Sequence, residues 1–244
     1  MNFHIMTLFP ALIDTVLSES IIGRARASGA ITVNIYNIRD HANNKHNKVD
    51  DTPYGGGMGM LMAAPPVCAC HDAITAQIPE TNTRRTVYMS PKGKLLDHGT
   101  AVRLSQYDDL IILCGHYEGI DERAIEEVAD EQISIGDYIL TGGELPACIL
   151  VDCVSRLVPG VLPDSSCYED ESIASGLLEY PQYTRPYEFR GKKVPDVLLS
   201  GHHANIEKWR REKSLELTKL YRPDLLDKDD RREESVEDEE RSGE

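Results

Sequence analysis

The order of apolar and polar positions along the chain predicts strands that alternate with helices. Asp109–Gly115 is a nearly continuous apolar run, which is typical of a central parallel strand buried on both faces. Ile31–Ile38 alternates apolar and polar side chains, as a strand with one buried face does. Glu144–Leu157 is strongly apolar and ends before a Pro-Gly pair, which indicates a buried helix. Such alternation favours an α/β domain with a mostly parallel sheet.

Further elements are expected on either side of these three. The expected strands are Asn2–Phe9, Arg84–Ser90 (broken by Ser90–Gly93) and Gln132–Ile135. The expected helices are Ala11–Leu17, Ile21–Ala27 closed by Gly29, Pro65–Gln77, the helix capped by Asp97 that runs to Leu104, and Ile120–Val128. The polar, glycine-rich segment 39–59 reads as a long loop, and such loops in compact domains are usually functional or disordered.

The pattern changes after the apolar helix. Leu162–Gly176 has no apolar period and contains proline, serine and acidic residues, so we expect a linker. A small helical unit follows, in which Ile206–Leu220 has helical spacing and Trp209 reads as an anchor of the core. The acidic tail from Asp227 has nothing to bury and is expected to be disordered.

Composition narrows the class of protein. The chain has 244 residues, enough for one sizeable domain and a smaller one. Its shares of 41% hydrophobic and 27% charged residues are typical of a soluble globular protein, and no apolar run is long enough to cross a bilayer, so no membrane partner is expected. The six cysteines lack metal-site spacing and stand mostly in apolar surroundings, which favours buried thiols, no bound metal and a cytoplasmic location.

The formal net charge of -15 argues at first against binding to nucleic acid. The charge is unevenly distributed, however. Residues 182–213 carry eight lysines and arginines against four carboxylates, a balance of +4 before the histidines. Residues 227–244 carry four against ten, a balance of -6. These two segments therefore suit partners of opposite charge.

Three glycine-containing loops follow three of the expected strands. They are Tyr88–Gly93, Cys114–Arg123 and Gln132–Pro146. Ligands of open α/β sheets bind beyond the carboxyl ends of the strands, so the three loops can form one pocket. Glycine allows main-chain amides and carbonyls to approach a ligand closely, and no lysine follows the glycines of Gln132–Pro146 as in phosphate-binding loops. That loop therefore favours a flat, neutral group such as a nucleobase.

A fourth glycine cluster lies in Asp50–Met60. It follows a polar loop and not a strand, which argues against a dinucleotide-binding fingerprint. Two interpretations stay open at this point. The segment is either a flexible lid or a wall of the pocket, with Asp50 or Asp51 facing the ligand.

Six segments together resemble one protein family. They are Val49–Met60, Leu113–Arg123, Ser134–Ala147, Val154–Leu162, Tyr183–Pro186 and Val194–Gly201. On these motifs the chain resembles the TrmD family, the bacterial tRNA (guanine-N1)-methyltransferases of the SPOUT superfamily. The resemblance is collinear from Met1 to about Leu226 and leaves out only the acidic tail.

The resemblance implies a fold and an assembly that the sequence pattern does not itself show. It implies a SPOUT α/β catalytic domain at residues 1–161, with a mostly parallel sheet and a trefoil knot at its C-terminal end. A flexible linker at 162–177, a small all-α tRNA-binding domain at 178–226 and a disordered tail at 227–244 follow. It also implies a homodimer whose active sites lie at the subunit interface.

The resemblance further implies a reaction. The family transfers the methyl group of S-adenosyl-L-methionine to N1 of the guanosine at position 37 of tRNA, just 3′ of the anticodon, which maintains the reading frame. Whether Mg²⁺ assists is left open. Two alternatives are a SPOUT enzyme that acts on another RNA, such as ribosomal RNA, and an RNA-binding factor that has lost catalysis.

Methyl transfer to guanine N1 requires the residue types that the resemblance places in the active site. Guanine N1 carries a proton at neutral pH, so a carboxylate must remove it and a cation near O6 must stabilise the resulting charge. Arg156 matches the family's arginine. Glu171 stands at the position of the family's catalytic aspartate, with Asp170 beside it, and either can be the base.

The remaining site residues are also carried over from the family. Those expected to bind S-adenosyl-L-methionine are Tyr88, Met89, Ser90, Pro91, Gly115, Tyr117, Glu118, Ile135, Gly136, Tyr138, Ile139, Leu140, Gly142, Gly143 and Pro146. Those expected to bind the tRNA are Asp50, Tyr54, Gly57, Arg185, Ser200 and His203. His116 and Thr52 stand where many relatives have arginine, and Met58 replaces a proline, which affects local tRNA contacts more than the reaction.

Overall fold

The apolar run predicted as a central strand forms β6 (Asp109–Cys114), and all six of its residues are buried. It lies in a five-stranded sheet of order β2-β1-β6-β5-β7, in which every neighbouring pair is parallel. The other strands are β1 (Asn2–Thr7), β2 (Thr32–Asn37), β5 (Arg84–Leu95) and β7 (Glu131–Ser134). The prediction of an α/β fold with a mostly parallel sheet is confirmed.

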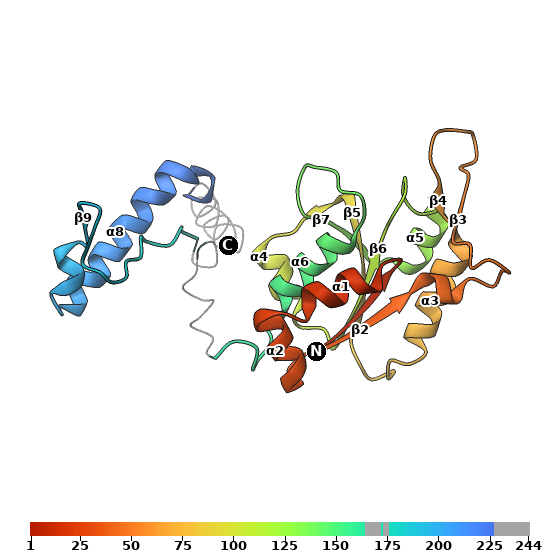
Figure 1. Ribbon diagram of the computed structural model, residues 1–244, viewed down its shortest axis with the longest axis horizontal. Helices are drawn as coiled ribbons and strands as arrows, with labels where there is room; N and C mark the ends of the chain where they lie inside the picture. The colour runs from red at the N-terminus through yellow and green to blue at the C-terminus, as the bar shows by residue number, and fades with distance from the viewer. Residues whose placement is uncertain (164–171, 173–175, 227–244) are drawn as a thin grey trace, which may run out of the picture. The chain divides into compact units, whose positions relative to one another are not determined.

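The computed structural model describes residues 1–163, 172 and 176–226 (Figure 1). The chain divides into two compact units, Met1–Ser165 and Ser166–Glu244. Asp170, Glu171 and the acidic tail from Asp227 lie outside the described residues. No helix in the described part of the chain is long and apolar enough to span a membrane.

Helices cover both faces of the sheet, and alternate residues of β6 point into two separate cores. Leu110 and Ile112 belong to one core, and Ile111 and Leu113 belong to the other. The first core includes α1 (Pro10–Leu17), α2 (Ser20–Ser28), α4 (His98–Leu104) and α6 (Glu144–Ser155). The second includes α3 (Ala64–Thr75) and α5 (Glu122–Val128).

Two predicted helix ends have the expected capping chemistry. Gly29 closes α2 with a left-handed φ of 78°, and its amide donates to carbonyls of the last helical turn. The Asp97 side chain caps α4 by accepting a hydrogen bond from the Thr100 amide at 2.8 Å. These local signals fix the C-terminal end of α2 and the N-terminal end of α4.

Strand β5 differs from the prediction, because it does not end at Ser90. Both Met89 and Lys94 pair with Ile133 of β7, so the segment between them bulges out and the strand then resumes. Gly93 makes this possible. A Cβ atom at that position would lie 2.4 Å from backbone atoms of Gln132 and Ile133, a distance that only glycine allows.

The long loop predicted at 39–59 contains some regular structure. It begins with a short 3₁₀ helix, η1 (Ile38–His41), and contains β3 (Asp50–Asp51). β3 pairs in antiparallel fashion with β4 (Leu61–Met62), so the glycine cluster between them forms the tip of a two-stranded excursion. The two ends of this segment are thereby held together.

The second unit is mainly helical. It contains η2 (Asp196–Leu199), α8 (His203–Tyr221) and η3 (Pro223–Leu225). It also contains a hairpin of β8 (Glu188–Phe189) and β9 (Lys192–Lys193), so the prediction of an all-α unit is wrong in this respect. The hairpin forms because Arg190 and Gly191 both adopt left-handed backbone angles, which suit a two-residue turn.

Candidate functional site

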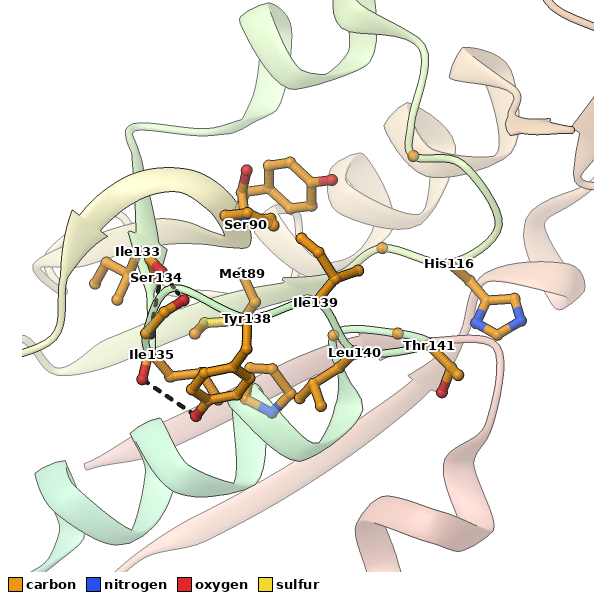
Figure 2. A pocket seen from close by; sticks show the side chains of 18 of the residues that line it. Met89, Ser90, His116, Ile133, Ser134, Ile135, Tyr138, Ile139, Leu140 and Thr141 are labelled. Carbon is orange, nitrogen blue, oxygen red and sulfur yellow. Dashed lines mark hydrogen bonds between the residues drawn. The ribbon is translucent and has the colours of Figure 1, made fainter. Parts of the chain in front are cut away.

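A cavity of about 260 Å³ lies at the carboxyl ends of β6 and β7 and beside the bulge of β5. The three glycine-containing loops predicted to converge there line it together, and all fifteen residues expected to bind the methyl donor are among the lining residues. Figure 2 shows the side chains of Tyr138, Ile139 and Leu140 within this group, with His116 on the side opposite Ile133 and Ser134. The sheet edge therefore brings together residues from three distant parts of the chain.

Close backbone approach between two of the loops shapes the floor of the cavity. The Gly143 amide donates a hydrogen bond to the Gly115 carbonyl at 2.8 Å. A Cβ atom at residue 143 would lie 2.8 Å from Cα of Cys114 and 2.9 Å from the Gly115 nitrogen. Because those are backbone atoms, a side chain at position 143 would push the loops apart.

A buried carboxylate supports the floor from below. Glu144 is the first residue of α6 and is 5% exposed, and its Oε1 atom accepts a hydrogen bond from the Thr7 hydroxyl at 2.8 Å. A Cβ atom at Gly142 would lie 2.4 Å from the other carboxylate oxygen and 3.0 Å from Nδ1 of His116. Gly142 thus lets Glu144 and His116 approach the loop backbone from two sides.

The walls of the cavity are largely apolar and aromatic. The Tyr138 ring folds against Gly136, whose φ is 147°, and the Tyr138 hydroxyl donates to the Ile135 carbonyl at 3.3 Å (Figure 2). Burial raises the pKa of the Tyr88 hydroxyl, and Glu122 and Cys114 raise it further, so Tyr88 is neutral at neutral pH. Such walls suit a flat, weakly polar ring.

The glycine loop of the 50–62 excursion borders the cavity through Glu118. The Glu118 amide donates to the Met60 carbonyl at 3.0 Å, and the Met62 amide donates to the Gly119 carbonyl at 2.9 Å. A Cβ atom at Gly59 would lie 2.4 Å from Cγ of Glu118. These contacts tie the loop to Glu118 and Gly119, but no residue of 50–62 is among the described residues that line the cavity, so both interpretations, a flexible lid and a wall of the pocket, stay predictions.

Comparisons with known proteins bear directly on this site. The sequence profile described as "tRNA (Guanine-1)-methyltransferase TrmD" matches residues 1–228. The chain belongs to this family. The family resemblance predicted from the motifs is confirmed, and the chain is thereby assigned to a family of enzymes.

Several relatives, each named tRNA (guanine-N(1)-)-methyltransferase, are similar to the chain over nearly its whole length. A protein of Ruminiclostridium cellulolyticum is 58% identical over 228 residues, covering 93% of this chain and 97% of its own. One of Lachnospira eligens is 57% identical, with 93% and 95% covered. One of Clostridioides difficile is 53% identical, with 93% and 98% covered.

The family's arginine position lies away from the cavity within one chain. Arg156 caps the C-terminal end of α6 and is half-buried, whereas Pro146 near the other end of that helix lines the cavity. Ten residues of α-helix separate the two positions by about 15 Å. One chain therefore does not bring Arg156 to the cavity.

The predicted tRNA-binding residues fall into two groups. Asp50, Tyr54 and Gly57 lie in the glycine loop, where Asp50 is half-buried and Tyr54 is fully exposed. Arg185, Ser200 and His203 are all exposed and belong to the second unit. Within the described ranges, no group of three histidine, cysteine or acidic side chains is placed to hold a metal ion.

Five lining residues were not among the predicted donor-binding residues. They are His116, Gly119, Ile133, Ser134 and Thr141. Four of them are adjacent in sequence to a predicted residue, and Ile133 lies two positions before Ile135, so extending each motif by one or two positions would have found them. His116 is the most distinctive, because its ring packs edge-on against Phe9 and Tyr117 with centroids 4.9 Å apart, and its Nδ1 atom is buried without a hydrogen-bond partner.

Proposed function

We propose that this protein transfers the methyl group of S-adenosyl-L-methionine to N1 of the guanosine at position 37 of tRNA, in the cytoplasm. The observation that carries the proposal is the family match over residues 1–228, together with relatives 53–58% identical that are named tRNA (guanine-N(1)-)-methyltransferase. The cavity supports it, because the residues expected to bind the donor line one site.

The cavity fits the chemistry of the donor. The apolar walls of Ile135, Leu140 and Pro146 suit the flat adenine ring, and the exposed loop amides and carbonyls suit its polar edge. Among the described lining residues, Glu118 is the only carboxylate, and the donor carries a cationic ammonium and a cationic sulfonium. When bound, the donor supplies an electrophilic methyl group.

The proton at guanine N1 must leave before that atom can accept a methyl group. Asp170 or Glu171 is the proposed base, in the segment that follows α6. The guanidinium of Arg156 is proposed to stabilise the negative charge that develops at O6. Mg²⁺ assistance is compatible with this scheme but no step depends on it.

The separation of Arg156 from the cavity supports a site shared by two copies of the chain. A homodimer allows the Arg156 end of one α6 to complete the cavity of the other copy. Exposed apolar side chains on α1 and α6 support such an assembly, since Leu12 and Val16 on α1 and Leu145 and Ile149 on α6 are each 40–49% exposed. These two helices pack against each other (Figure 1).

We also propose the trefoil knot and the order of domains that the family resemblance implies. A knot formed by the 115–143 region would need its two loops to cross closely, and the hydrogen bond between Gly143 and Gly115 is consistent with this. The units 1–161, 162–177 and 178–226 would then be the catalytic domain, the linker carrying the base and the tRNA-binding domain. A crystal structure that traces residues 115–143 without a crossing would refute the knot.

Transfer of a radiolabelled methyl group tests the function. We expect label on a tRNA transcript that carries two guanosines at the 3′ edge of the anticodon, and no label when the target guanosine is replaced by adenosine. Label on ribosomal RNA alone would instead favour the alternative of a SPOUT enzyme that acts on ribosomal RNA. Replacing Asp170 and Glu171 singly by Ala should identify the base, with a loss of turnover of about 10²-fold or more for the true one.

A further inference from the structure

The β8–β9 hairpin of the second unit holds a large apolar ring in solvent. Phe189 is 63% exposed and pairs with Lys192 on the other strand. Arg190 and Gly191 connect the strands with φ angles of 51° and 76°, as in a type I′ turn. Arginine is unusual at such a position, because its Cβ atom disfavours left-handed backbone angles. Such a tight turn fixes the directions of Phe189 and Arg190.

Two cations of this hairpin have no ion pair in the described part of the chain. They are Arg190 and Lys192, whereas Lys193 lies 3.7 Å from Glu188. On α8, Lys208, Arg210 and Lys213 each lie within ion-pair distance of a glutamate. Arg190 and Lys192 are therefore available to an external anion beside the exposed ring of Phe189.

The ring and the cation also lie together. The guanidinium carbon of Arg190 lies 5.2 Å from the centroid of the Phe189 ring, which leaves the opposite face of the ring open to a second flat group. An aromatic face beside unpaired cations is the arrangement that binds unpaired nucleotides, with the base stacked on the ring and phosphates near the cations.

We propose that the β8–β9 hairpin binds the tRNA substrate, with an unpaired base stacked on Phe189 and backbone phosphates neutralised by Arg190 and Lys192. The inference rests on the proposed function, since it takes tRNA as the substrate. The net charge of -15 repels RNA in general, so binding depends on local cationic surfaces such as this one. An acidic protein would pair with the cations Arg190 and Lys192 but would not stack on the ring of Phe189.

Replacing Phe189 tests the stacking. Phe189→Leu should weaken binding of a fluorescein-labelled, unmodified tRNA transcript by about ten-fold in fluorescence anisotropy, whereas Phe189→Trp should bind within about two-fold of wild type because it keeps a stacking ring. Tyr221→Leu is the matched control, because Tyr221 is 67% exposed at the C-terminal end of α8, away from the hairpin in Figure 1. Equal binding by wild type and Phe189→Leu would overturn the proposal, as would equal losses for the Leu and Trp variants.

Replacing Lys192 tests the phosphate contact. Lys192→Gln should lower the slope of log Kd against log salt concentration by about 1, while Lys219→Gln on the exposed side of α8 should leave the slope unchanged. Equal slopes for Lys192→Gln and wild type would refute the contact. Weaker binding of polyglutamate by Phe189→Leu, to the same degree as tRNA, would refute the assignment to RNA.

The outcomes separate this inference from the proposed function. Binding of S-adenosyl-L-homocysteine, measured by calorimetry, should be the same in all hairpin variants and wild type. A wild-type protein that methylates no tRNA would refute both. A wild-type protein that methylates tRNA, combined with full tRNA affinity in Phe189→Leu, would refute the hairpin contact alone.

Discussion

At the scale of single residues, burial raises the pKa of two groups beside the cavity, a thiol and a phenol. Burial raises the pKa of the Cys114 thiol well above its usual value, and the nearby Glu144 carboxylate adds to this effect. Burial likewise raises the pKa of Tyr88. Glu118, which lies against Gly59, is the only carboxylate among the described residues that line the cavity.

Glu118→Gln should weaken the binding of S-adenosyl-L-methionine by about ten-fold, which corresponds to about 1.4 kcal/mol. The loss for S-adenosyl-L-homocysteine should be smaller, because that molecule lacks the sulfonium charge. Titration calorimetry measures both affinities. Glu122→Gln is the control, since Glu122 is an exposed acid paired with Lys92 and does not line the cavity. Equal losses for the two ligands would show that Glu118 does not contact the sulfonium.

A second residue-scale prediction concerns the amino-terminal end of the sheet, where Asp109 is 2% exposed. Burial alone would raise its pKa, but hydrogen bonds from Asn82, His4 and Asn2 outweigh this effect and lower the pKa below its usual value of 3.8. A lowered pKa in the folded state means that this stabilisation is present above pH 3.8 and is lost as the pH falls through the folded-state value.

The expected result is a fall in the free energy of unfolding as the pH drops below 3.8, part of which belongs to Asp109. Asp109→Asn should be less stable than wild type at pH 7 by about 1–3 kcal/mol and should show a shallower acid dependence. Urea unfolding between neutral and acid pH measures this. Glu126→Gln is the control for the loss of stability at pH 7, because Glu126 is an exposed acid of α5 for which the described part of the chain shows no side-chain hydrogen bond. An unchanged acid slope in Asp109→Asn would contradict the assignment.

At the scale of elements, the floor of the site depends on loops that meet where no side chain fits. Gly143→Ala should separate the loop at Gly115 from the loop at Gly143, because the new methyl group would lie 2.8 Å from Cα of Cys114. We expect a loss of stability of about 1–3 kcal/mol and a loss of donor affinity of about ten-fold or more. Thermal unfolding and calorimetry measure the two effects.

Gly99→Ala is the matched control for that substitution. Gly99 lies in α4, where a Cβ atom would come no closer than 3.7 Å to Asp97, so alanine should be neutral or stabilise the helix by up to about 1 kcal/mol. If both variants behaved alike, the close approach of the loops would have no energetic importance.

Elements with a complete local signal were predictable from the sequence, and elements that depend on distant partners were not. The buried run of β6 and the cap at Asp97 follow from neighbouring residues. The second segment of β5 depends on Gly93 meeting the backbone of β7, which no local pattern encodes. The β8–β9 hairpin was missed because Arg190 is not a residue that signals a left-handed turn position.

At the scale of the whole molecule, the family resemblance predicted which residues line the cavity, and the sheet order explains why they meet. β6 and β7 end at one edge of the sheet, where their neighbour β5 bulges, so the three glycine-containing segments converge. The position of Arg156 could not be read in this way. Its distance from the cavity follows from the length of α6, and completion of the site by a second chain is a proposal.

The last prediction concerns that second chain. Leu12→Glu on α1 and Ile149→Glu on α6 should each convert the proposed dimer into monomers in sedimentation velocity, because each places a charge among the exposed apolar side chains proposed to form the interface. Methyl transfer should fall by about 10²-fold if the catalytic groups come from the other copy. Leu220→Glu, at a 66% exposed position of α8, should remain dimeric and active. Monomers that retain full activity would show that one chain completes the site. Arg156 would then have to reach the cavity of its own subunit.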